Sequence, residues 1–401
     1  MTVGQSEADL LVPPSGEIGR LRSRAVLVAG GGVALSLLAY VLVGEAFWQS
    51  YLIAYVFWHG ITMGALAVLM VHHLSGGAWG MVARRILEAA TRTLSLTALL
   101  FIPIVVKMQT LYSWARPEAA DDAIIQAKAA YLNPEGFILR AVLYFVIWGV
   151  LIFLLNRWSR EQDENPPALP GPQDRRSRVL SGPGLVLYVL TVTFMSIDWV
   201  MSLDPHWFST IFGILTLGGQ GLSTMAFSLV VLAALVKFRP MSGVLGAEQV
   251  HDISKLMFAF VLLWAYFNVS QLIIIWSGNL PEEIPYYLER LHGPWLAVSV
   301  LVVLGQFALP FLLLLSRDLK RNIQRVKWIA LAILVMRVVD IIWTIGPVFR
   351  HDGSSLSWVD FAVTLGMGGV WLTYFWTTLA ARAVVPAKDP YFKEAMAHGG
   401  H

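Results

Sequence analysis

Two aspartates and a histidine follow one another at the end of a long apolar stretch, in the segment FMSIDWVMSLDPHWFST at 194–210. Asp198 lies inside the apolar run, and Asp204 and His206 come shortly after it. A carboxylate beside a histidine in a partly dry setting can titrate near neutral pH, as proton transfer requires. An ionisable side chain within a membrane span costs about 2.5–3.5 kcal/mol on insertion scales unless it is paired or hydrated. The segment therefore predicts a site with a purpose beyond packing.

Other polar side chains interrupt apolar stretches on the side of the membrane that we predict to be the outer one. They are His59, Arg140, Asn268, Gln271, Arg337 and Asp340, with His292 just beyond a span. Arg337 and Asp340 are three residues apart on one helix, so a simple neutralising pair explains them at least as well as a functional site. For Asp198 we favour function, because no cation lies within one turn of it on its own helix. With Asp204 and His206, these residues form the predicted outer part of a proton path or quinone-associated surface.

A second polar group is predicted near the cytoplasmic side. It contains His72, His73, Glu88, Arg92 and Lys255, with His251 and Asp252 nearby. Glu88 and Arg92 are four apart in the favourable order for a helical ion pair. Each of these residues, taken alone, is explained as an interfacial residue whose polar end reaches the membrane–water interface. Together with the outer group they could form two half-channels, linked mid-membrane through Gln220, Gln306 or water.

The chain has no cysteine. It therefore cannot hold an iron–sulfur cluster through thiolates, a thioether-linked haem or a disulfide. Haem b needs axial histidines from facing spans at matched depth, and only His59 lies clearly away from the cytoplasmic edge. No zinc motif or Gly-rich phosphate loop is present, and the glycines at 30–32 suit close helix packing. We expect no metal or redox centre held by this chain alone.

The composition predicts an all-α polytopic membrane protein. Hydrophobic residues make up 57% of the chain and charged residues 14%, with a mean hydropathy of +0.64, whereas soluble domains carry about 25% charged residues. The first 24 residues are polar and precede what we interpret as an uncleaved anchor. A span needs about 20 apolar residues, and ten runs qualify: 25–44, 52–74, 86–106, 137–156, 183–202, 208–236, 254–276, 294–316, 327–346 and 358–384.

The basic residues predict the orientation. With a cytoplasmic N-terminus, 21 of the 29 Lys and Arg fall in the inside segments, five in the outside loops and three within spans. This bias alternates strictly across ten spans, so both termini are predicted to be cytoplasmic. Two outside loops, 107–136 and 277–293, are long enough to contact a partner, and the first should contain a short surface helix. The inside loop 157–182 is rich in Pro and charge and predicts an irregular strap.

An internal repeat relates the two halves. DWVMSLDP at 198–205 matches DIIWTIGP at 340–347, and a weaker match joins HGITMG at 59–64 to FGILTL at 212–217. Both pairs lie four spans apart, which implies a parallel repeat about an axis along the membrane normal. The predicted architecture is two parallel-related four-helix bundles with two peripheral helices. Its parts are a cytoplasmic segment at 1–24, a peripheral helix at 25–51, bundles at 52–202 and 203–346, and the tenth helix with its tail at 347–401.

With the motif SIDWVMSLDPHWFSTIFG, ten spans and a two-bundle repeat, the chain resembles the ActF subunits of bacterial alternative complex III, within the NrfD-like (polysulfide-reductase C-like) membrane proteins. The resemblance covers nearly the whole chain, and the motif is its most specific part. It implies a respiratory quinol oxidoreductase of the bacterial cytoplasmic membrane, with haem c and iron–sulfur clusters in partner subunits. The implied partners are an ActC-like sister subunit nearer the clusters, an iron–sulfur protein, c-type cytochromes and membrane lipids, with no nucleic acid.

We therefore expect a subunit of a quinol:cytochrome c, or similar acceptor, oxidoreductase without its own redox centre. Its expected contribution is a proton-conducting polar path, a quinone-associated surface, or both. A secondary transporter is the first alternative, because parallel repeats and intramembrane acids suit one too. Against it, no pair of spans shows a clear Gly/Pro interruption, and LGGQG at 217–221 comes nearest. A purely structural membrane anchor is the second alternative.

Overall fold

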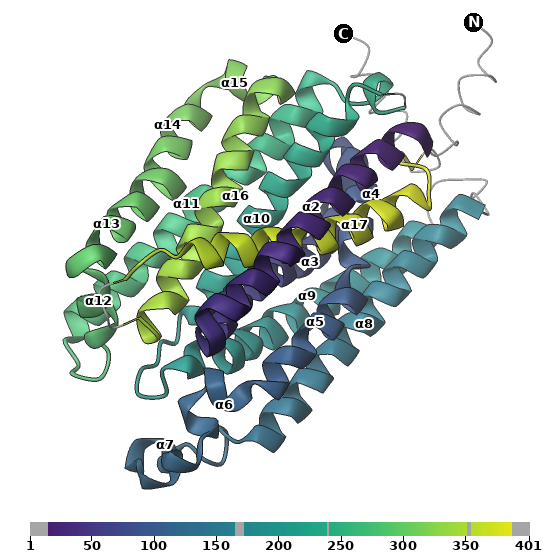
Figure 1. The fold of residues 1–401 in the computed structure, drawn as a ribbon. Helices are drawn as coiled ribbons and strands as arrows, with labels where there is room; N and C mark the ends of the chain where they lie inside the picture. The colour runs from purple at the N-terminus through teal and green to yellow at the C-terminus, as the bar shows by residue number, and fades with distance from the viewer. Residues whose placement is uncertain (1–14, 165–171, 239, 351–353, 387–401) are drawn as a thin grey trace, which may run out of the picture.

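The computed structural model describes residues 15–164, 172–238, 240–350 and 354–386, and every regular element in this part of the chain is a helix (Figure 1). Eight helical segments are long and apolar enough to cross a membrane. They are Gly16–Ser75, Ala78–Val106, Pro134–Glu164, Arg175–Leu203, Phe212–Leu235, Ala247–Gly278, Gly293–Leu315 and Ile323–Val348. The chain thus has the all-helical, multi-pass membrane-type fold that its composition predicts.

The first half of the chain supplies six long helices. They are α2 (Ser15–Val43), α3 (Phe47–Ser75), α4 (Ala78–Thr91), α5 (Leu94–Val106), α8 (Pro134–Glu164) and α9 (Pro172–Trp199). A 3-10 turn at Gly44–Ala46 separates α2 from α3, so the 60-residue apolar segment is a helical hairpin. Only Arg92 and Thr93 separate α4 from α5. Short helices, among them α6 (Met108–Leu111) and α7 (Ala123–Ala127), fill the connection to α8.

The second half contributes the remaining long helices. They are α10 (Phe212–Leu235), α11 (Ala247–Gly278), α13 (Gly293–Val302), α14 (Leu309–Leu315), α16 (Ile323–Ile345) and α17 (Trp358–Ala380). A π-helix, Val303–Ala308, joins α13 to α14 without a break. The short helices α12 (Pro285–Arg290) and α15 (Arg317–Arg321) lie at opposite ends of the bundle (Figure 1).

Helices α3 and α10 form the centre of the molecule. α3 packs against α4, α9, α10 and α17, while α10 also packs against α9, α11 and α16. Small residues allow the central pair to approach, since a Cβ on Gly64 would lie 2.3 Å from the Gln220 carbonyl oxygen. The outermost pair is built in the same way: α2 lies along α17 (Figure 1), and a Cβ on Gly32 would lie 2.5 Å from the Gly366 Cα. Close backbone approach through glycine is a common basis of helix association in membranes.

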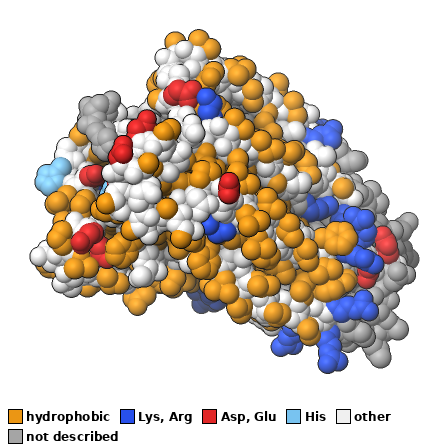
Figure 2. Space-filling view, turned by 90° about the horizontal axis from the view of Figure 1, so that it is seen from below, with side chains coloured by type: hydrophobic (Ala, Val, Ile, Leu, Met, Phe, Trp, Pro, Cys, Tyr) orange, Lys and Arg blue, Asp and Glu red, His pale blue; other side chains and the backbone are white. Residues whose placement is uncertain are grey.

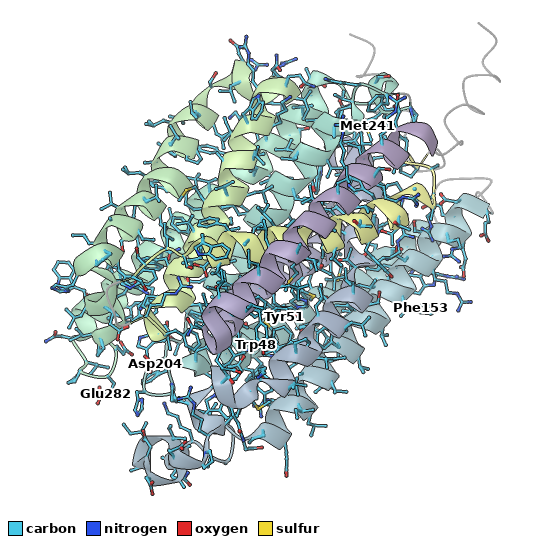
Figure 3. All side chains as sticks on the ribbon, in the orientation of Figure 1. Trp48, Tyr51, Phe153, Asp204, Met241 and Glu282 are labelled. Carbon is cyan, nitrogen blue, oxygen red and sulfur yellow. The ribbon has the colours of Figure 1, made fainter. Side chains whose placement is uncertain are left out.

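The surface has the distribution expected of a chain in a lipid bilayer. Apolar side chains such as Leu27, Phe153 and Trp276 are 62–78% exposed, and the other described residues do not cover them. Figure 2 shows hydrophobic side chains across the middle of one face and most of its Lys and Arg at one end. Asp204 and Glu282 lie at the opposite end of the molecule from Met241 (Figure 3). The two ends therefore differ in charge, as the sequence predicts.

Three expectations about segment boundaries are corrected or refined. The third span starts at Ala78 rather than near residue 86, so Arg84 and Arg85 lie within a helix and are buried instead of lining a loop. The expected irregular strap at 157–182 is largely helical, because α8 continues to Glu164 and α9 begins at Pro172, with 165–171 outside the described residues. The expected short helix in the first outer loop is confirmed as α7.

Candidate functional site

A polar cavity lies where the two halves of the chain meet. It has a volume of about 80 Å³ and is lined by α3 and α9 of the first half and by α10, α11, α12 and α16 of the second. Its wall is mostly aromatic and aliphatic. The polar side chains in the wall are His59, Thr216, Gln220, Ser223, Asn268, Tyr286, Arg337, Asp340 and Thr344. A buried water needs about 10–15 Å³ of such cavity space, so the cavity has room for water.

Arg337 and Asp340 form a buried ion pair in this wall. The Arg337 Nη1 donates to the Asp340 carboxylate one turn further along α16, and the two side chains are only 10% and 7% exposed. Trp264 Nε1 donates to the same carboxylate at 3.1 Å. A Cβ on Gly219 would lie 2.2 Å from Arg337 Nη2, so only glycine leaves room for the guanidinium there. The predicted i, i+3 pair is confirmed, and its charges compensate each other.

His59 is the cavity's histidine. Its Nδ1 lies 3.2 Å from Thr97 Oγ1, whereas its Nε2 is buried and has no hydrogen-bond partner among the described residues. Aromatic rings enclose the imidazole: Tyr55 stacks on it at 5.4 Å between centroids, and Trp148 and Trp199 lie at 5.4 and 5.3 Å. A buried ring nitrogen without a protein partner, beside a cavity with room for water, is a place where a water molecule can make the missing hydrogen bond.

Asp198 has partners that its own helix does not supply. Arg140 Nε of α8 donates to Asp198 Oδ2 at 2.9 Å, and Tyr144 Oη donates to the same oxygen at 2.8 Å. The side chain is 1% exposed and its Oδ1 has no partner among the described residues. Burial of this acid is confirmed, but its neighbour is an arginine rather than His59. Asp198 is also not among the residues that line the cavity, whereas the next residue, Trp199, is.

Asp204 and His206 lie at the surface of the molecule and do not line the cavity (Figure 3 labels Asp204). His206 Nε2 lies 2.8 Å from Asp122 Oδ2, and its backbone N–H donates to Asp204 Oδ1 at 3.1 Å. Asp122 also caps α7 by accepting from the backbone N–H groups of Ile124 and Ile125. These amides, together with the His206 contact, lower the pKa of Asp122 below its ordinary value. This cluster joins the first outer loop to the α9–α10 connection.

The inner group is organised around Glu88, which is 1% exposed. Its carboxylate accepts from Arg84 Nε at 2.9 Å, from Arg85 Nη1 at 2.7 Å and from Ser159 Oγ at 2.6 Å, and Arg382 Nη1 lies 3.6 Å away. Asp163 and Gln162 of α8 complete the cluster through Arg85 and Arg84 respectively. α4 is thereby attached to α8 and to the end of α17.

Two predicted members of the inner group are placed elsewhere. Arg92 does not pair with the Glu88 carboxylate: its Nη2 donates to the Thr378 carbonyl oxygen at 2.8 Å and its Nε to the Glu88 carbonyl oxygen at 3.4 Å. The expected i, i+4 pair is therefore wrong, because the guanidinium turns toward α17. Lys255 is exposed and pairs with Asp252 at 3.1 Å.

The inner histidines and the two glutamines predicted to link the half-channels are buried, but they do not line one common cavity. His72 and His73 are 3% and 6% exposed, with ring centroids 5.6 Å apart. Gln220 lines the cavity and accepts from Tyr188 Oη at 2.6 Å. Gln306 lies in the π-helix, is fully buried, and has no partner for either amide atom among the described residues. Among the described residues, neither Gln306 nor any residue of the inner group lines the cavity, so the link between two half-channels stays a prediction.

Several structurally important charges are absent from the sequence-based list. Arg290 is 1% exposed and donates to the carbonyl oxygens of Trp343, Tyr286 and Thr344, so it caps the end of α16. Burial lowers the pKa of Arg290. Asp360, at the start of α17, is fully buried and pairs with Arg350 at 2.6 Å. The i−4 spacing of an arginine before Glu88 is visible in the sequence, whereas the Arg290 contacts depend on the tertiary fold.

Comparisons with known proteins add no name to this geometry. No family model matches the chain, and no curated protein matches it. Within the described residues, no group of three or more His, Cys, Asp or Glu side chains is arranged to hold a metal ion. The cavity is also smaller than pockets that bury small organic ligands, which have volumes of about 300–1,000 Å³, several times the volume found here.

Proposed function

We propose that this chain is a membrane subunit of a quinol-oxidising respiratory complex of the alternative complex III type, without a redox centre of its own. Its proposed contribution is a hydrated chamber that relays protons in the outer half of the membrane. The partners would be an ActC-like sister subunit, an iron–sulfur protein and c-type cytochromes in a bacterial cytoplasmic membrane. The observation that carries the proposal is the cavity of about 80 Å³, which places an unpartnered His59 Nε2 beside a buried ion pair.

The proposed topology has ten spans with both termini in the cytoplasm. Two features support a count above eight: the first apolar segment is a hairpin of two 29-residue helices, and α17 has 23 residues and packs against α2 and α3. The segregation of Lys and Arg to alternate connections supports the orientation. Reporters fused after the last residue should be active only in the cytoplasm, and activity only in the periplasm would overturn this topology.

The proposed repeat of two bundles is supported by local geometry. Ser202 Oγ donates to the Asp198 carbonyl oxygen at 2.5 Å, and Thr344 Oγ1 donates to the Asp340 carbonyl oxygen at 2.8 Å. These residues are equivalent in the sequence match. Each half also has a side chain from a connecting segment that donates to a backbone carbonyl oxygen shortly after the aspartate. In the first half Tyr112 donates to the Trp199 carbonyl oxygen, and in the second half Arg290 donates to the Trp343 carbonyl oxygen. The cavity lies where the two proposed bundles meet.

Within the chamber, the residues have separable roles. The Arg337–Asp340 pair supplies fixed, mutually compensating charges that favour water over lipid in the cavity. His59 supplies the titrating nitrogen, held in place by Thr97 and by the aromatic rings around it. Imidazole can accept a proton at one nitrogen while the other stays hydrogen-bonded, which is the property that a proton relay needs. The size of the cavity supports a chain of waters rather than a bound quinone.

The test is His59→Gln in the assembled complex, reconstituted in vesicles. Glutamine keeps a hydrogen-bonding group near Thr97 but cannot titrate. We expect normal assembly with a lower turnover or a lower proton-to-electron ratio, and a loss of the pH dependence that His59 imparts. The matched control is His292→Gln, since His292 is an exposed outer histidine whose Nδ1 lies 2.7 Å from the Leu288 carbonyl oxygen. Unchanged turnover, proton ratio and pH profile in an assembled His59→Gln complex would refute the relay.

Purification separates the respiratory proposal from its alternatives. A subunit of an oxidoreductase should leave the membrane together with haem-bearing and iron–sulfur partners. A secondary transporter should be extracted from the membrane without partner proteins and should bind a solute that protects the transporter from unfolding. Isolation without haem-bearing partners would contradict the respiratory proposal even if His59 proved to titrate.

A further inference from the structure

A long groove runs along the lipid-facing side of α8, and its lining residues are different from those of the central cavity. One wall is α8 from Phe145 to Glu164, and the other is the junction of α4 with α5, from Thr91 to Ala98. Twenty residues of α8 at 1.5 Å per residue make the groove about 30 Å long. Its volume of about 770 Å³ is in the range of sites that hold organic ligands. None of the residues that line the groove belongs to the proposed proton relay.

The lining of the groove changes along its length from apolar to cationic. The membrane part is lined by Leu94, Ala98, Phe145, Gly149, Ile152 and Phe153. Phe153 is 62% exposed and projects from the surface of α8 (Figure 3). At Gly149 a Cβ would meet nothing within 4 Å, so the groove is open above this residue. The other end is lined by Arg92, Arg157, Arg160, Glu161 and Glu164. This gradient matches a molecule with an acyl chain and a charged head.

The charged end is net positive, because three arginines, Arg92, Arg157 and Arg160, line it with two carboxylates, Glu161 and Glu164. Glu161 is shared, at 3.0 Å from Arg157 and 3.7 Å from Arg176. Among the described residues, no carboxylate pairs with Arg92 or Arg160. Directly behind the groove, Arg382 is buried against the Glu88 cluster, and its burial together with the positive charges of Arg85 and Arg160 lowers its pKa. An anion in the groove would relieve this excess of positive charge.

One buried acceptor in the groove also lacks a donor. Asn156 is 7% exposed and lines the groove. Its Nδ2 donates to Thr91 Oγ1 at 3.2 Å and to the Ile152 carbonyl oxygen at 3.0 Å, but its Oδ1 has no partner among the described residues. A buried carbonyl oxygen without a donor is costly, so a ligand that carries a hydroxyl group is favoured at this position.

We propose that the groove is a binding site for an anionic glycerophospholipid with a hydroxyl-bearing headgroup, such as phosphatidylglycerol. One acyl chain lies along the apolar part of α8, the phosphate lies among Arg92, Arg157 and Arg160, and a headgroup hydroxyl donates to Asn156 Oδ1. Basic pockets between membrane helices on the cytoplasmic side are a recurring form of such sites. The site would fix the junction of α4 and α5 against α8.

Two variants separate recognition of the head from recognition of the chain. Arg160→Gln removes an exposed charge that makes no ion pair among the described residues. Gly149→Leu fills the open part of the groove, and because leucine is the better helix former it should fold. The matched control is Arg325→Gln, which removes an exposed arginine from the start of α16, outside the groove.

The experiment uses the purified, delipidated full-length chain in detergent, titrated with phosphatidylglycerol or phosphatidylcholine. Bound lipid is counted by native mass spectrometry at two salt concentrations. We expect one phosphatidylglycerol per chain at this site, bound about fivefold more weakly in Arg160→Gln with a reduced salt dependence. We expect a loss of more than tenfold in Gly149→Leu and wild-type affinity in Arg325→Gln.

Each other outcome overturns the proposal. Equal binding of both lipids would remove the role of charge. Wild-type lipid binding in Gly149→Leu would place the lipid elsewhere. Inorganic phosphate that binds wild type and Gly149→Leu equally, with no bound lipid, would make the groove a simple anion site. A quinone that co-purifies with wild type and is lost in Gly149→Leu would assign the groove to a neutral ligand.

Discussion

Replacing Glu88 by glutamine should be among the most destabilising single changes in this chain. Glu88 is 1% exposed, and of the carboxylates that the structure describes it alone lies within 4 Å of three arginines. Glutamine keeps the shape and one acceptor oxygen. Its amide group, however, brings N–H donors to the position where Arg85 Nη1 and Arg382 Nη1 now approach an acceptor. The variant therefore leaves buried guanidinium charge without a counter-ion.

The expected size follows from the contacts. Two arginine-to-carboxylate hydrogen bonds, at 2.9 and 2.7 Å, lose their charge. Hydrogen bonds to charged groups contribute about 1.5–3 kcal/mol each, which gives a loss of about 3–6 kcal/mol. Breaking a buried ion pair from one side costs about 3–5 kcal/mol, which agrees. The free energy of unfolding should fall by about 3–5 kcal/mol.

The measurement is denaturant-induced unfolding of the purified chain in mixed micelles, followed by tryptophan fluorescence. The matched control is Glu161→Gln, because that carboxylate lies on the end of α8 that contacts the Glu88 cluster, is 36% exposed and pairs with Arg157. An exposed pair contributes about 0–1 kcal/mol. Adding Arg85→Gln to Glu88→Gln should recover about 1–3 kcal/mol, since it removes the uncompensated charge. If Glu88→Gln were as stable as Glu161→Gln, the charge argument would be refuted.

Three further outcomes are expected. Gly366→Leu should separate α17 from α2, because even a Cβ at this position would lie 2.6 Å from the Gly32 carbonyl oxygen of α2. Cross-linking between the two helices should weaken in this variant and should be unchanged in Gly31→Leu, where a Cβ would meet nothing within 4 Å. The low pKa of Asp122 means that its cap of α7 is fully present above the ordinary carboxyl pKa of about 3.9 and is lost only as pH falls through the lower folded value. Hydrogen exchange of the Ile124 amide should thus show constant protection from pH 8 to 5, and Asp122→Ala should abolish it throughout. The isolated subunit should be colourless, and a b-type haem spectrum from it would contradict the absence of a redox centre.

The helices could be predicted from the sequence because their signal is local. An apolar run of about 20 residues identifies a membrane helix wherever its neighbours lie. The same holds for contacts within one helix: the Arg337–Asp340 pair follows from i, i+3 spacing alone. The extension of α4 back to Ala78 was less visible, because Arg84 and Arg85 lower the local hydropathy although both are buried in the fold.

Contacts between helices could not be predicted in the same way. Pairing Asp198 with Arg140 requires the relative depth and rotation of α8 and α9, which a single sequence does not contain. Glu88 shows the same difficulty: its arginine four residues later is turned away, while Arg382 arrives from the end of α17. The cavity is harder still to foresee, because it depends on how side chains from six helices fail to fill the space between them.

The distribution of buried charge changes which residue is the best candidate for proton transfer. Within the described residues, all four buried carboxylates, Glu88, Asp198, Asp340 and Asp360, pair with an arginine. If one of these acids gave up its charge, it would leave a buried arginine without its partner. Asp198→Asn would leave Arg140 without a counter-ion, and Asp340→Asn would do the same to Arg337. Loss of stability should therefore be the main effect of both variants. His59, by contrast, lies beside the cavity and makes no ion pair, and for this reason it is the residue that we propose for the relay.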